Sequence, residues 1–84
     1  MDMVKPDQLG KLVEAGAIQE AVAIADGRRW RVEVRTGMSR QAVATRRGQV
    51  RYWSRLDTLA GYLRDRGIGR WCVDASAWTP EQQE

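Results

Sequence analysis

Histidine and phenylalanine are absent from this 84-residue chain, and cysteine occurs once, at Cys72. Without histidine, acid–base pairs and triads built on an imidazole are excluded, and a zinc site is not expected. One cysteine cannot form a disulfide within the chain. No apolar run approaches the roughly 18 residues of a membrane span, and the amino terminus has no apolar signal segment. We therefore expect a cytoplasmic protein that is not an enzyme, with no metal or cofactor and no membrane contact.

Lysine is also scarce, because twelve of the fourteen basic residues are arginine. From Arg28 to Arg55 the chain has nine arginines and one acid, Glu33, a net charge of +8 against +3 for the whole protein. Such a concentration attracts phosphate or another polyanion, and the planar guanidinium suits bidentate contacts. The candidate phosphate contacts are Arg29, Arg31, Arg35, Arg40, Arg46, Arg47 and Arg51. Arginines on a wet sheet face can also serve only solubility, but the scarcity of acids here favours an anionic partner.

Two helices are expected from capping residues and apolar spacing. Pro6 suits the first turn of a helix and Gly16 suits its end, which predicts a helix over residues 6–15. A second helix is expected between Ser54, as its capping residue, and Gly67, with leucines at helical spacing between them.

Four segments alternate between apolar and polar residues with the period of two that is typical of strands. They are residues 17–25, 29–35, 40–46 and 68–74. Asp26-Gly27, between the first two, is a strong hairpin signal. Val22 and Ile24 of the first strand and Trp30 of the second are expected to face the core, and the arginines to take the opposite face.

The expected order is α-β-β-β-α-β, an α+β fold in two layers. A three- to four-stranded antiparallel meander carries the helices on one face. Residues 1–78 form the single domain, and residues 79–84 are expected to be a flexible tail. The last strand pairs with an edge of the sheet or with a second copy. Together with Trp78, which lies outside every regular element, this predicts a homodimer.

Cys72 and two aromatic residues have alternative interpretations. Cys72 near Asp74 is the nearest feature to an enzyme site, but a lone cysteine is typically a small buried hydrophobe. Trp53 can pack at the start of the second helix. With Tyr52 and Arg51 it can instead form a platform on which nucleic-acid bases stack.

Several segments carry a resemblance to a known family. They are Glu14-Ala15-Gly16-Ala17-Ile18, Arg31-Val32-Glu33-Val34-Arg35-Thr36-Gly37, Thr45-Arg46-Arg47-Gly48, Arg51-Tyr52-Trp53-Ser54-Arg55-Leu56-Asp57-Thr58-Leu59-Ala60, Gly67-Ile68, Val73-Asp74 and Ala77-Trp78. In these the chain resembles the small ParC-like, partition-associated accessory proteins of plasmids and integrative elements. The resemblance implies a role beside a partition or maintenance operon, with DNA or a partition protein as partner and no known catalysis.

A second likeness is to the arm-type DNA-binding domains of tyrosine recombinases, which read DNA with a three-stranded sheet. It rests on Trp30-Arg31-Val32-Glu33-Val34-Arg35 and the helix after residue 54, while the first helix and last strand depart from that pattern. We expect a DNA-associated accessory protein that binds phosphates with weak sequence specificity. The alternative is a protein–protein adaptor or dimerisation module whose arginines meet an acidic partner.

Overall fold

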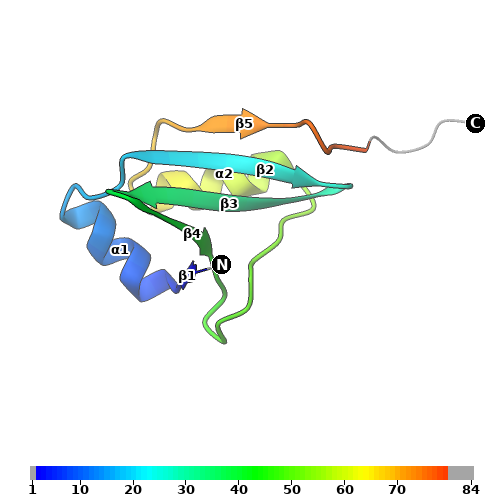
Figure 1. The fold of residues 1–84 in the computed structure, drawn as a ribbon. Coiled ribbons are helices and arrows are strands. Elements are labelled where there is room, and N and C mark those ends of the chain that lie inside the picture. The colour runs from blue at the N-terminus through cyan, green and yellow to red at the C-terminus, as the bar shows by residue number, and fades with distance from the viewer. Residues whose placement is uncertain (1, 80–84) are drawn as a thin grey trace, which may run out of the picture.

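The computed structural model of this protein describes residues 2–79, which form one sheet and two helices (Figure 1). The elements are β1 (Asp2–Val4), α1 (Pro6–Glu14), β2 (Glu20–Asp26), β3 (Arg29–Thr36), β4 (Ser39–Val43), α2 (Leu56–Asp65) and β5 (Cys72–Asp74). Within the described residues the sheet has five strands in the order β1-β4-β3-β2-β5. The predicted α+β class is confirmed.

The expected meander is present as β2, β3 and β4. β2 and β3 pair antiparallel from Glu20 opposite Arg35 to Asp26 opposite Arg29, and β4 pairs antiparallel with the other edge of β3. Gly27 has a φ of 71° in the turn between β2 and β3, a conformation that glycine adopts without steric cost. The alternation of residues and the Asp26-Gly27 signal were therefore sufficient to predict this part of the fold.

The prediction of a purely antiparallel sheet was wrong, because both edge strands are parallel to their neighbours. β1, which was not expected, pairs with β4, and β5 pairs with β2. Parallel strands need a crossover connection, usually a helix. α1 lies between β1 and β2 in the chain, and α2 lies between β4 and β5. Each helix is therefore a crossover between strands that run in the same direction. At three residues, Asp2–Val4 is too short to show an alternating pattern.

The helix boundaries are close to the expected ones. α1 begins at Pro6, and the backbone N–H of Lys5 donates to Oε1 of Gln8 at 3.2 Å. The N-cap of α2 is Arg55 and not Ser54, so the predicted cap was wrong. In the part of the chain that the structure describes, no helix is long and apolar enough to cross a membrane.

The core lies between the helices and one face of the sheet. Its largest fully buried side chains are Val4, Leu9, Val32, Val34, Val43, Leu59 and Leu63. From β2 it receives Ala21, Ala23 and Ala25, each at most 3% exposed. The prediction that Val22 and Ile24 face the core was wrong. Both are half-buried on the opposite face, where they lie beside charged residues of β3.

Candidate nucleic-acid interface

The side of the sheet away from the helices, called the open face below, carries four of the seven candidate arginines. Arg29, Arg31 and Arg35 alternate along β3 with core residues, and Arg40 of β4 lies opposite Arg35. Strand register adds other residues to this face: Met3, Glu20, Val22, Ile24, Asp26, Glu33, Ala42, Cys72 and Asp74. The expected arginine face therefore includes Arg29, Arg31, Arg35 and Arg40, but Arg46, Arg47 and Arg51 lie elsewhere, so the prediction of one continuous basic face was wrong.

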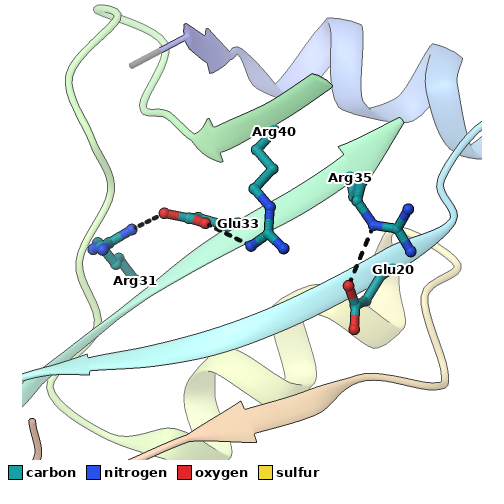
Figure 2. A network of polar contacts seen from close by, with 5 residues as sticks. All are labelled: Glu20, Arg31, Glu33, Arg35 and Arg40. Atoms are coloured by element: carbon teal, nitrogen blue, oxygen red, sulfur yellow. Dashed lines mark hydrogen bonds and ion pairs between the residues drawn. The ribbon is translucent and has the colours of Figure 1, made fainter. Parts of the chain in front are cut away.

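Glu33 is the centre of an ion-pair network on the open face (Figure 2). Its Oε2 lies 2.6 Å from Nη1 of Arg31, and its Oε1 lies 3.6 Å from Nη1 of Arg40. Glu33 is only 9% exposed. Because one nearly buried carboxylate holds two guanidinium groups, both arginines are partly neutralised before any partner arrives.

The other two arginines of the open face are also paired with acids. Nε of Arg35 lies 3.4 Å from Oε1 of Glu20 (Figure 2), and Nη2 of Arg29 lies 3.7 Å from Oδ2 of Asp26. With Asp74, which lies opposite Ile24, the open face has four acids and four arginines. Its formal charge is therefore zero, although β3 and β4 alone are strongly basic.

Arg46 and Arg47 lie away from the open face, in a tight turn after β4. The N–H of Thr45 donates to the carbonyl of Gln49 at 2.7 Å, which closes the turn. The side chain of Lys5 lies against it, because a Cβ on Gly48 would be 3.4 Å from Cε of Lys5. We call Lys5, Arg46 and Arg47 the basic corner. All three are exposed, and none forms an ion pair with a residue that the structure describes.

Arg51 is held by aromatic rings. Its guanidinium carbon lies 4.9 Å from the ring centre of Trp53 and 4.8 Å from that of Tyr62. Trp53 is 4% exposed, so it cannot offer a surface for base stacking. Tyr52 is 37% exposed, but the guanidinium of Arg29 lies 3.7 Å above its ring. The proposed Tyr52–Trp53 platform is therefore not formed.

A pocket at the β2–β3 hairpin was not expected from the sequence. Its walls are Arg28, Arg29, Ser54, Trp78 and Thr79, and its volume is about 530 Å³. We call it the hairpin pocket. The only sequence signal was Trp78, a large aromatic residue outside any regular element.

Cys72 is exposed, so its expected burial was wrong. Asp74, two residues later, accepts hydrogen bonds from the hydroxyl and the N–H of Ser76, and these lower the pKa of its carboxyl group. Among residues 2–79 no three cysteine or carboxylate side chains are grouped so that they could hold a metal ion.

Comparison with curated proteins and with solved structures gave no match. A family model described as ParC-like matches residues 4–82, which span every element from α1 to β5. The segments that suggested this resemblance are distributed over the same length of chain. The chain therefore belongs to the ParC-like family.

Proposed function

We propose that this protein is a DNA-associated accessory factor in the partition or maintenance of a plasmid or integrative element. Membership of the ParC-like family supports the partition role. The proposal places the protein in the cytoplasm and gives it no catalytic step. DNA is bound through phosphates, with weak sequence specificity, because leucines on α2 are committed to the core and leave no base-reading row.

The basic corner is the observation that supports DNA binding best. Lys5 lies against the turn that carries Arg46 and Arg47, and none of these three cations has an acidic partner in an ion pair among residues 2–79. On the open face, by contrast, every arginine already has a carboxylate within 4 Å. A phosphate would have to compete with that carboxylate for the guanidinium. We therefore assign the principal phosphate contacts to the basic corner, and a secondary role to Arg29, Arg31, Arg35, Arg40 and Arg51.

The test is binding of a labelled DNA duplex by fluorescence anisotropy at several salt concentrations. Each phosphate contact contributes about −0.9 to the slope of log affinity against log salt, so three contacts give about −2.7. The double variant Arg46→Glu/Arg47→Glu should weaken binding to all duplexes alike and reduce the slope to about −0.9.

The matched control is Arg35→Glu/Arg40→Glu, which changes the net charge equally but on the open face. Its affinity should fall much less than that of the corner variant. If both double variants lose affinity equally, the corner is not the site. Absence of wild-type binding at low salt would reject the DNA function.

The second candidate function is a protein–protein adaptor, and the composition of the open face favours it. Half-buried Val22 and Ile24, together with Met3, which is 41% exposed, lie among charged residues of both signs. Apolar residues bordered by polar ones are typical of protein interfaces. The partner would be a partition protein of the same operon whose acids bind Arg35 and Arg40. Isothermal titration calorimetry with that protein should then show loss of binding for Arg35→Glu/Arg40→Glu and not for Arg46→Glu/Arg47→Glu.

Self-association into a homodimer remains part of the proposal. β5 is an edge strand of three exposed residues, and Val73 is 47% exposed on it. An uncovered edge with apolar side chains is a surface on which a second copy can add its own strand. Sedimentation velocity at tens of micromolar should show a dimer, and a species of 9.5 kDa would contradict this.

A further inference from the structure

The hairpin pocket is built where three segments meet that are distant in the sequence. Arg28 and Arg29 come from the β2–β3 hairpin, Ser54 from the segment before α2, and Trp78 with Thr79 from the segment after β5. The volume of about 530 Å³ is within the range of small-ligand pockets. No residue of the basic corner lines this pocket, so it is a separate site.

Backbone hydrogen bonds hold all three segments in place. The N–H of Thr79 donates to the carbonyl of Gly27 at 2.8 Å, and the N–H of Gly27 donates to Ala77 at 3.1 Å. Trp30 and Trp53 exchange two backbone hydrogen bonds of 2.8 and 2.9 Å, which tie the segment before α2 to β3. The walls are therefore preformed, and a ligand does not have to order them.

The aromatic wall is Trp78, whose side chain is only half covered. Trp78 is 49% exposed, whereas Trp30 is 7% and Trp53 is 4% exposed. A large indole is usually covered in a folded protein, and an exposed one commonly marks a binding site. Its flat face is suited to stacking against another aromatic ring.

The other walls are cationic and polar. Arg29 stacks on Tyr52 at 3.7 Å, which fixes its guanidinium at the edge of the pocket. The carboxylate of Asp26 lies 3.7 Å from Arg29, but this pair is more than half exposed and a phosphate can displace it. Arg28 also lines the pocket, and the hydroxyls of Ser54 and Thr79 complete the lining. A ligand for this site needs both an aromatic ring and an anionic group.

We propose that the hairpin pocket binds an unpaired nucleotide, with the base stacked on Trp78 and the phosphate held by Arg29. Stacking on an aromatic side chain tolerates any base, and guanidinium groups bind phosphate through paired hydrogen bonds. The nucleotide can belong to single-stranded DNA or be free in solution, because both present the same base and phosphate. A duplex keeps its bases stacked on each other and cannot fill the site.

The test follows the four indole N–H signals of the isotope-labelled full chain by NMR, with Trp78 assigned from Trp78→Phe. Titration with thymidine monophosphate and with a twelve-residue oligothymidine should shift the Trp78 signal and leave that of buried Trp53 in place. Inorganic phosphate alone should bind more weakly and leave the Trp78 signal unmoved. If phosphate binds as tightly as the nucleotide, no base is stacked and the proposal fails.

Anisotropy of the labelled oligothymidine gives the second readout. Trp78→Ala should weaken binding about 5- to 150-fold, the range for loss of one base–aromatic stack, whereas Trp78→Phe should retain most of the affinity. Met38→Ala is the matched control, because Met38 is fully exposed in the β3–β4 turn, at the opposite end of β3. Wild-type affinity in Trp78→Ala, with its fold verified by circular dichroism, would overturn the proposal.

Comparing the monophosphate with the oligothymidine distinguishes the two sources of the nucleotide. Equal affinity for the monophosphate and the oligomer identifies a free-nucleotide site, and a much tighter oligomer identifies single-stranded DNA. Neither outcome depends on duplex binding at the basic corner. Arg46→Glu/Arg47→Glu should leave the Trp78 shift induced by the monophosphate unchanged. Loss of that shift in this variant would show that there is no independent site.

Discussion

The two faces of the sheet differ in the kind of side chain that they carry. Against the helices, β3 places Val32 and Val34, which are at most 1% exposed, while β2 places only alanines. On the open face the larger Val22 and Ile24 of β2 lie beside Glu33 and the arginines. The helix face therefore excludes water with apolar volume, whereas the open face balances charge around a half-covered apolar centre.

This difference shows what an alternating pattern can and cannot reveal. An alternating pattern predicts which residues of a strand share a face, and this prediction was correct for β3. It does not state which face the helices cover when both sets of residues are apolar, as in Ala21-Val22-Ala23-Ile24. It also says nothing of charges on neighbouring strands, which decide whether an arginine is free.

Enlarging one residue on each face of β2 should give the largest difference between the two faces. Ala23 is completely buried against the helices, so Ala23→Leu should lower the free energy of unfolding by about 2–3 kcal/mol through overpacking. Val22→Leu, on the open face, should change it by less than about 0.5 kcal/mol. Urea unfolding of both variants measures this. Equal effects, or a larger effect at Val22, would reverse the assignment of the faces.

The second variant tests the charge balance of the open face. Glu33→Gln keeps the shape of the side chain but removes the charge that Arg31 and Arg40 share, and should lower the free energy of unfolding by about 1.5–2 kcal/mol. Arg40→Ala should cost less than about 0.5 kcal/mol, because a pair with an exposed member contributes little. Arg40 is 64% exposed. If Glu33→Gln is as stable as the wild type, the network is incidental to folding.

The fold was predictable where local signals agreed. Pro6, Gly16 and the Asp26-Gly27 turn define α1 and the β2–β3 hairpin from a few residues each. The parallel edges were not predictable, because β1 and β5 have three residues each and their pairing depends on crossovers by the helices. Helix capping also failed locally. Arg55, and not Ser54, is the N-cap of α2, and its guanidinium donates to the carboxylate of Asp57.

The candidate site was predictable only as a set of residue types. The sequence places Arg31, Arg35 and Arg40 together, but Glu20, the acidic partner of Arg35, lies on another strand, fifteen positions earlier in the chain. The hairpin pocket needs residues 28 and 78 side by side, which follows from the parallel pairing of β5 with β2. Neither the sequence of the hairpin nor that of the segment after β5 indicates this long-range pairing.

Cys72 reports on the edge of the open face. Because its thiol is exposed in a single copy of the chain, it should react with a thiol reagent at nearly the rate of a small free thiol when the protein is dilute enough to be monomeric. Cys72→Ser should change the free energy of unfolding by less than about 0.5 kcal/mol. A thiol that reacts only after urea is added would show that the edge is covered in solution, for instance by a second copy.

The smallest effect is expected at Asp74, the fully exposed acid of the same edge, and it concerns pH. The hydroxyl and N–H of Ser76 donate to the Asp74 carboxylate and hold its pKa below the ordinary value. A carboxyl group whose pKa is lower in the folded state stabilises the fold above its unfolded pKa, and this contribution disappears as the pH falls through the folded pKa. Ser76→Ala removes the hydroxyl donor, so the pKa of Asp74 should rise towards its ordinary value, and NMR titration of the carboxyl carbon measures this directly. An unchanged Asp74 pKa in Ser76→Ala would show that the hydroxyl hydrogen bond does not persist in solution.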